Sequence, residues 1–177
     1  MTSREDRFQA LYADARVDVL RFVQRRVHPS HAEDVVADAF LVVWRRLDDA
    51  PARHGDLRAW LFGIARNCLL NALRGQGRGE ALAVRLAEAV PAPDGFDPEL
   101  VALRIDLAAA WRTLSAGEQE VLALAVFEQL DSTRAARVLG ITAVAYRLRL
   151  MRARRALRRQ LEHPHPQPTL TAVEEAA

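Results

Sequence analysis

The chain has 177 residues, enough for one ordinary domain or two small ones, and its hydrophobic content of 50% excludes a disordered chain. No apolar run approaches the roughly 18 residues of a membrane span, and the first residues lack a secretory core. We therefore expect a cytoplasmic protein without membrane insertion. Cys68 is the single cysteine, which excludes an internal disulfide and a cysteine-based zinc site.

The formal net charge of +2 hides an uneven distribution of charge. All 25 basic residues are arginines, which suit phosphates and guanine edges, although a coding bias toward arginine would give the same composition. Residues 112–161 contain 10 arginines and 4 acids, whereas residues 75–111 and 162–177 each have a net charge of −3. A basic block of this kind is typical of a surface that binds a polyanion.

Three amphipathic helices are predicted before residue 75, because apolar residues recur there at every third or fourth position. Ser30 and Glu33 have the spacing of a capping box at the start of the second helix, and Asp56 is expected to cap the third. Cys68 is expected to be an apolar core position of the third helix rather than a reactive thiol.

Segments rich in glycine and proline interrupt this helical pattern. Residues 78–96 are predicted to be a flexible linker, in which residues 80–90 could form a short helix. The proline-rich residues 163–177 are predicted to be a disordered tail. Its His163 and His165 have no carboxylate or thiol beside them, so we expect no metal site.

A second helical unit is predicted over residues 97–162. Asp97 followed by Pro98 is a typical helix start, and Ser115 with Glu118 forms a capping box. The helix after that box is expected to turn four apolar residues inward: Val121, Leu122, Ala125 and Val126.

The end of this unit has the pattern of a helix-turn-helix. Ala136 is the small residue at which two steeply crossing helices can touch, and Gly140 can adopt the positive φ of the turn. Thr142 is expected to cap the second helix, whose apolar stripe runs from Tyr146 to Leu161 against the core. Such a helix would lie in the DNA major groove with its first turns on base edges.

The remaining faces of that helix carry seven arginines and no acid. They would repel one another unless a polyanion neutralised them, which favours DNA over a solvated basic helix or an acidic protein partner. The seven are Arg147, Arg149, Arg152, Arg154, Arg155, Arg158 and Arg159. The sequence has no nucleophile with a paired base and no phosphate-binding glycine loop, so we expect neither covalent catalysis nor a cofactor.

Four motifs follow one another along the chain, at residues 31–45, 57–67, 114–122 and 139–158. Together they resemble the extracytoplasmic-function sigma factors of bacterial RNA polymerase, and the resemblance covers about residues 6–161. It implies an all-α fold of two small helical domains joined by a flexible linker, the C-terminal one a helix-turn-helix.

The resemblance also assigns a role to each part of the chain. Residues 1–77 correspond to sigma region 2, which docks on the polymerase clamp and recognises and melts the minus-ten promoter element. Residues 97–162 correspond to sigma region 4, which recognises the minus-thirty-five element. The linker, residues 78–96, and the tail, residues 163–177, lie outside both regions.

In region 2, Asp34 and Asp38 resemble the surface that docks on the clamp, although helix solvation and the helix dipole also explain two acids there. Four residues of the third helix resemble the part that binds unpaired minus-ten bases. A core position for the tryptophan and a polar last turn for the others are the alternatives. The four are Trp60, Asn67, Asn71 and Arg74.

In region 4, the resemblance places Arg147, Arg149 and Arg152 on the minus-thirty-five element. Arg154 belongs to the same DNA-binding set and, like Arg155 and Arg158, meets phosphates or the polymerase flap. Departures from the family pattern occur at Ala37, Asn71 and Leu148, and the first helix of the turn lacks the usual acids.

The function implied is that of a dissociable initiation subunit whose partners are core RNA polymerase, promoter DNA and an anti-sigma protein held between the two domains. One rival reading is a free-standing helix-turn-helix regulator, which leaves the N-terminal half unexplained. The other is a sigma-like interaction protein that does not act through core polymerase.

Overall fold

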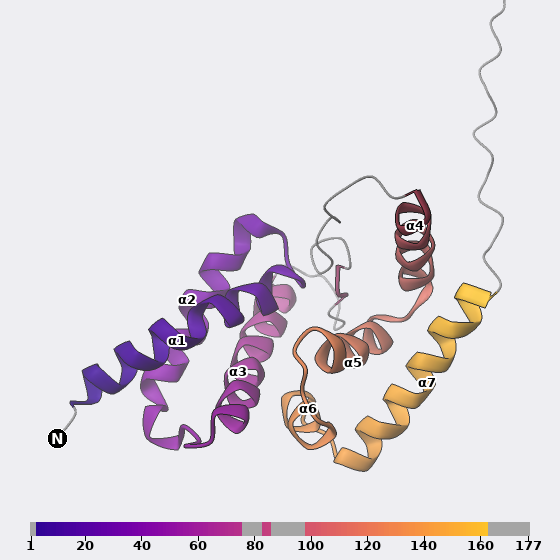
Figure 1. Ribbon diagram of the computed structural model, residues 1–177. Helices are drawn as coiled ribbons and strands as arrows, with labels where there is room; N and C mark the ends of the chain where they lie inside the picture. The colour runs from indigo at the N-terminus through magenta and orange to yellow at the C-terminus, as the bar shows by residue number, and fades with distance from the viewer. Residues whose placement is uncertain (1–2, 76–82, 86–97, 163–177) are drawn as a thin grey trace, which may run out of the picture.

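The computed structural model describes residues 3–75, 83–85 and 98–162, and all regular structure within these ranges is helical (Figure 1). The all-α prediction is confirmed. The N-terminal unit comprises α1 (Arg4–Gln24), α2 (Pro29–Arg45), the short 3-10 helix η1 (Leu47–Asp49) and α3 (His54–Gly75). The C-terminal unit comprises α4 (Pro98–Thr113), α5 (Ala116–Val126), α6 (Ser132–Leu139) and α7 (Ala143–Glu162).

Several predictions concern residues that the structure does not describe. They are most of the linker, the Asp97 cap and the tail with its two histidines. Of the short helix expected within residues 80–90, the structure describes residues 83–85, which are not helical. In the described part of the chain, no helix combines the length and the apolar character that crossing a membrane would require.

The N-terminal unit is held together by apolar faces of α1, α2 and α3. Phe22 of α1 is fully buried and stacks on Phe62 of α3, with ring centroids 4.8 Å apart. Phe40 of α2 packs edge-on against Tyr12 at 4.7 Å. Cys68 is half-buried, and burial, aided by the nearby Asp38 carboxylate, raises the pKa of its thiol, as expected of a core position.

The two helix starts expected in this unit differ from the prediction. Helix α2 begins at Pro29, and the capping side chain is His28, which accepts a hydrogen bond from the Ser30 backbone N–H. Proline is favourable in the first turn, so the helix begins before the expected box. Glu33 instead pairs with Arg16 of α1 at 2.9 Å.

Asp56 is likewise not the cap of α3, because the helix begins at His54 and Asp56 lies inside its first turn. The carboxylate remains close to the positive end of the helix dipole, yet its hydrogen-bond partners are arginines of α6. The residue that was expected to start one helix therefore joins two.

In the C-terminal unit, the capping box at α5 is confirmed. Ser115 accepts from the Glu118 backbone N–H, and the Glu118 carboxylate accepts from the Ser115 backbone N–H at 2.9 Å. The prediction that Val126 faces inward is wrong, since it is 58% exposed. Helix α5 is instead buried on several sides over residues 119–124, because neighbouring helices surround it.

The two units share one hydrophobic core. The largest buried cluster joins residues of α1, α2 and α3 to Leu124 of α5, Val138 of α6 and Tyr146 of α7. Figure 1 shows α6 beside α3 at the centre of the molecule, and these two helices pack against each other. A second, smaller cluster around Trp111 and Leu122 holds the C-terminal unit together.

The described linker residues also belong to this second cluster. Val84 is 2% exposed, and its carbonyl accepts a hydrogen bond from the Trp111 indole N–H at 2.6 Å. Its N–H donates to the buried Gln119 side chain at 3.0 Å, while Arg85 N–H donates to the Arg25 carbonyl of the N-terminal unit. This part of the linker is therefore bonded to both units.

Candidate nucleic-acid and polymerase interfaces

The turn between α6 and α7 has the geometry expected of a helix-turn-helix. Ala136 is 2% exposed, and Gly140 has a φ of 67°, a left-handed conformation that glycine adopts without steric cost. Ile141 N–H donates to the Ala136 carbonyl at 3.0 Å and closes the end of α6. Thr142 caps α7 by accepting from the Ala145 N–H at 3.1 Å.

Tyr146 anchors α7 to the core. Its ring is fully buried, its hydroxyl donates to the Val121 carbonyl of α5 at 2.9 Å, and burial raises its pKa to about 12. Ala153 is also fully buried, whereas Leu161 at the end of the expected stripe is 38% exposed. Tyr146 and Ala153 thus hold one side of α7 against the core over its first three turns. The opposite side of the helix faces outward.

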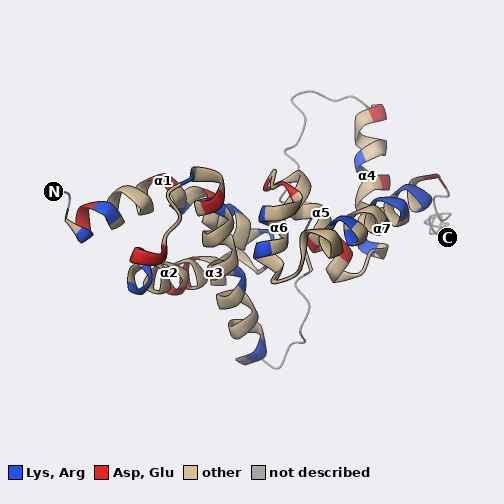
Figure 2. Cartoon of the chain, turned by 90° about the horizontal axis from the view of Figure 1, so that it is seen from below, with Lys and Arg blue, Asp and Glu red and all other residues tan. Residues whose placement is uncertain are grey.

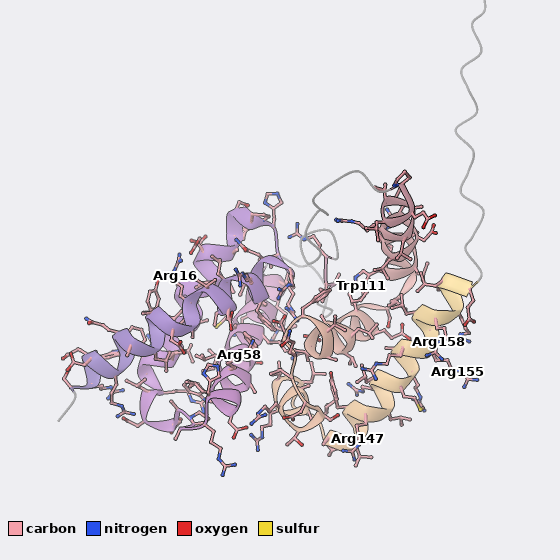
Figure 3. The ribbon with its side chains drawn as sticks, in the orientation of Figure 1. Arg16, Arg58, Trp111, Arg147, Arg155 and Arg158 are labelled. Carbon is pink, nitrogen blue, oxygen red and sulfur yellow. The ribbon has the colours of Figure 1, made fainter. Side chains whose placement is uncertain are left out.

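All seven arginines of α7 are exposed. None of them forms a hydrogen bond or ion pair with another residue in the ranges that the structure describes. Figure 2 shows basic residues recurring along α7, and in Figure 3 Arg147, Arg155 and Arg158 project away from the rest of the molecule. Their positive charge is consequently available to a polyanion.

The four residues expected to bind minus-ten bases lie on one face of α3, because separations of seven, four and three residues are close to whole helical turns. Asn67 is exposed, while Trp60 is partly buried and packs against the shared core. Asn71 and Arg74 are exposed and bonded to each other, the guanidinium donating to the amide oxygen at 2.9 Å.

A pocket of about 240 Å³ opens on this face. Trp60 and Asn67 line it from α3, and the Arg46 guanidinium lies 5.9 Å from the centroid of the Trp60 ring. Arg137 of α6 also lines this pocket, and a Cβ atom on Gly63 would lie 3.9 Å from the Val138 Cα of α6. The α3 face therefore borders the C-terminal unit directly.

The expected clamp-docking acids lie on the outer side of α2. Asp34 and Asp38 are exposed and form no hydrogen bond or ion pair within the described residues, whereas Val36 and Phe40 point into the core. Leu41, one turn after Asp38, is 56% exposed although it is apolar. Two free carboxylates and an exposed leucine thus share one face.

Ion pairs connect the two units beside the pocket. Asp56 of α3 accepts from Arg134 and Arg137 of α6, each at 3.0 Å. The Arg134 hydrogen bond holds the pKa of the Asp56 carboxyl below its usual range. On another turn of α3, Arg66 makes two hydrogen bonds to the Glu120 carboxylate of α5, at 2.8 and 3.1 Å.

A third connection is buried. The Glu128 side chain is 3% exposed and accepts from Arg25 at 3.0 Å and from Arg26 at 3.4 Å, both at the end of α1. Arg26 is completely buried and stacks on Phe22, its Cζ 3.6 Å from the ring centroid. Burial lowers the pKa of Arg26, and three guanidinium nitrogens of this pair have no hydrogen-bond partner: Arg25 Nε, Arg26 Nε and Arg26 Nη2.

These interdomain residues were missed by sequence reasoning. The sequence analysis assigns no role to Glu120 or Glu128, yet both are buried. The contacts join residues 54 to 103 positions apart, a separation at which helical periodicity carries no signal.

Two family models match the chain. The model described as Sigma-70 region 2 matches residues 11–79, and the model described as Sigma-70, region 4 matches residues 104–157. The first match includes the faces of α2 and α3 described above, and the second includes the helix-turn-helix.

Similar proteins are sigma factors. RNA polymerase sigma factor CnrH of Cupriavidus metallidurans is 34% identical over 140 residues, 71% of this chain and 70% of that protein. ECF RNA polymerase sigma factor SigL of Mycobacterium tuberculosis is 28% identical over 156 residues, 87% of this chain and 88% of that one.

Solved structures agree with this similarity. CnrH in complex with the cytosolic domain of CnrY superposes with a TM-score of 0.59 at 28% identity, covering 89% of each chain. The sigma factor RpoE in complex with the anti-sigma factor NepR from Bartonella quintana shares the fold, with a TM-score of 0.63 at 24% identity over 89% of this chain and 98% of that one. With its region 2 and region 4 in order along one helical chain, the protein belongs to the ECF sigma factors of RNA polymerase.

Proposed function

We propose that this sigma factor binds core RNA polymerase through α2, binds minus-ten DNA through α3 and places α7 in the major groove of the minus-thirty-five element. The observation that carries the proposal is the row of seven exposed arginines on α7, which have no partner among the described residues. Such a charge is stable on a surface that meets phosphates. The sigma factor family is not an enzyme class, and we assign no covalent chemistry to this chain.

In the minus-thirty-five complex, Arg147, Arg149 and Arg152 contact base edges from the first turns of α7. Arg154, Arg155 and Arg158 lie further along the helix and contact phosphates or the polymerase flap. The fully buried Tyr146 supports this arrangement, because it fixes the rotation of the helix about its own axis.

In the minus-ten complex, unpaired bases enter the pocket beside Trp60 and Asn67. Flipping a base costs a few kcal/mol, which stacking on Trp60 and hydrogen bonds to the amide offset. The hydrogen bond between Asn71 and Arg74 supports a phosphate site at the end of the same face, because it orients the guanidinium. Residues 1–77 and 97–162 are the two DNA-binding parts.

The docking face of α2 comprises Asp34, Asp38 and Leu41. Its free carboxylates suit a basic surface of the polymerase clamp, and the exposed leucine adds apolar contact area. An anti-sigma protein is a further partner, since the solved structures of CnrH and RpoE contain CnrY and NepR.

The experiment that tests the function is reconstitution with core RNA polymerase. The full chain is expected to co-purify with the core enzyme and to direct run-off transcripts from particular promoters. A free-standing regulator would bind duplex DNA without associating with polymerase, and a sigma-like interaction protein would associate without yielding a promoter-specific transcript. Either result would refute the proposal.

A further inference from the structure

The outward side of α7 has an apolar strip at its centre. Val144, Leu148 and Met151 are 66%, 43% and 59% exposed, and contiguous exposed apolar side chains of this kind are typical of an interaction surface. Their separations of four and three residues place them on one line. At 100° per residue, that line lies opposite the fully buried Tyr146 and Ala153.

Arginines border this apolar strip on both sides. Arg147 lies along one edge of the strip and Arg152 along the other, and Arg155, Arg158 and Arg159 follow on the next turns of the same side of α7. No acidic residue occurs from residue 132 to residue 161, so the charged residues that surround the strip on α7 are all arginines.

We propose that Val144, Leu148 and Met151 contact the C5 methyl groups of thymines in the major groove and make promoter recognition depend on thymine. Phosphates bound to Arg154, Arg155 and Arg158 would hold the helix in the groove, with the strip and the flanking Arg147 and Arg152 over the base edges. In the major groove, the methyl group is what an apolar side chain can distinguish on a base pair. The inference rests on the proposed function, because it specifies what the minus-thirty-five contact recognises.

An apolar protein surface is the other possible occupant of the strip. The observations favour DNA, because a protein that covered the strip would also have to supply acids to the arginines on both edges, whereas the major groove offers arginine base-edge acceptors between two phosphate backbones. Along the helix axis, the strip extends about 10 Å at 1.5 Å per residue, which equals about three base-pair steps.

The test uses the full chain assembled with core RNA polymerase. Duplexes are selected from a library that is randomised upstream of the transcription start, and each thymine of the selected minus-thirty-five element is then replaced singly by deoxyuridine. This replacement removes one methyl group and leaves the hydrogen-bonding edge unchanged. We expect at least one thymine at which binding weakens about fourfold, the effect of losing one buried methyl.

Alanine variants assign the effect to the strip. In Leu148→Ala, the ratio of thymine to deoxyuridine affinity is expected to fall to about one at one position, and Val144→Ala and Met151→Ala are expected to act at adjacent positions. Val126→Ala removes an equally exposed aliphatic side chain from α5 and is the matched control, with the wild-type ratio retained. Circular dichroism verifies that each variant keeps its helices.

The outcomes separate this inference from the proposed function. If the holoenzyme selects a defined element, but replacing each of its thymines by deoxyuridine leaves the affinity unchanged, the inference is wrong and the proposed function stands. If the ratio of thymine to deoxyuridine affinity stays about fourfold in all three alanine variants, the inference is also wrong. The strip would then be a contact for a protein partner. If the holoenzyme selects no sequence at all, the proposed function fails together with the inference.

Discussion

Gly140 shows how much a single residue contributes to the DNA-binding unit. Its φ of 67° turns the chain between α6 and α7, and no other atom lies within 4 Å of the place a Cβ would occupy. The constraint at this position is therefore the backbone conformation rather than space. The same turn sets the direction of α7. A substitution that strains the backbone at Gly140 is therefore expected to change the orientation of the recognition helix.

We predict that Gly140→Ala lowers the free energy of unfolding by about 1–2 kcal/mol, the cost of a left-handed conformation for a residue with a Cβ. Urea denaturation followed by circular dichroism measures the change. Gly117→Ala is the matched control, because Gly117 lies in the first turn of α5 with an open Cβ position, and the change there is expected to be neutral or stabilising. Equal losses in both variants would contradict the prediction.

Glu128 is the most deeply buried acid among the ion pairs between the units. It is the acceptor for both Arg25 and Arg26, and its side chain is 3% exposed. Removing one partner from a buried pair leaves the other charge without compensation.

We predict that Glu128→Gln destabilises the protein by about 3–5 kcal/mol, the range for breaking a buried ion pair. Glu33→Gln breaks the exposed pair with Arg16 and is expected to cost at most about 1 kcal/mol. Both values come from urea denaturation at neutral pH. Similar losses in the two variants would mean that the Glu128 cluster is hydrated.

At the scale of helices, periodicity predicted the elements because each helix has an apolar face that the sequence displays locally. The Ser115 box, the Gly140 turn and the Thr142 cap were also predictable, since all their partners lie within five residues. The cap predicted at Asp56 was wrong because the helix begins two residues earlier, at His54, and helix boundaries are the least predictable part of a local pattern. The inward position predicted for Val126 was wrong because burial depends on which other helix lies nearby, and that information is not local.

The α2 face gives a prediction about polymerase docking. Changing Asp34 and Asp38 together to arginine is expected to weaken binding to core polymerase, because both side chains are exposed and form no ion pair within the described residues. Helicity and stability are expected to remain unchanged for the same reason. Pull-down with core polymerase measures the binding, and circular dichroism measures helicity and stability. Unaltered polymerase binding would show that neither residue belongs to the docking face.

The contact between α3 and α6 gives a pH dependence. The Arg134 hydrogen bond lowers the pKa of Asp56 from its ordinary value of 3.8, so the unfolded chain binds this proton more readily than the folded one. The stabilisation is therefore complete above about pH 4 and is lost as the pH falls through the lower folded-state pKa. Asp131, which caps α6, is shifted in the same direction by the Arg134 and Thr133 backbone N–H groups.

Asp56→Asn tests this dependence. The variant is expected to be less stable than the wild type at pH 7, and the difference in the free energy of unfolding is expected to shrink below about pH 4. Urea denaturation between pH 7 and pH 3 measures both curves. A difference that stayed constant over this range would show that Asp56 acts through its shape rather than its charge.

At the scale of the whole molecule, the packing of the two units was not predictable from the sequence. The sequence indicates two helical units with a linker, and the structure adds a common core in which α3 packs against α6. The residues at this contact are a set of small, apolar and charged side chains that serve equally well on a free surface. Their role emerges only when helices distant in sequence meet.

A reversible cross-link tests whether this packing hinders the minus-ten face. In a Cys68→Ser background, Gly63→Cys and Val138→Cys would place two thiols across the contact, where a Cβ at Gly63 lies 3.9 Å from the Val138 Cα. Oxidation is expected to abolish binding to a minus-ten single strand in the presence of core polymerase, and reduction to restore it. Gly63→Cys alone is the control, and strand binding by the oxidised protein would refute the prediction.

The packing of α6 against α3 also has a thermodynamic consequence for every partner that needs the α3 face. Such a partner binds only the fraction of molecules in which the units have separated, so its apparent Kd equals the intrinsic Kd divided by that fraction. With one molecule in about a hundred separated, the apparent affinity would be about a hundredfold weaker. A change at Glu128, which lies outside the pocket beside Trp60 and Asn67, can therefore tighten minus-ten binding without touching the DNA.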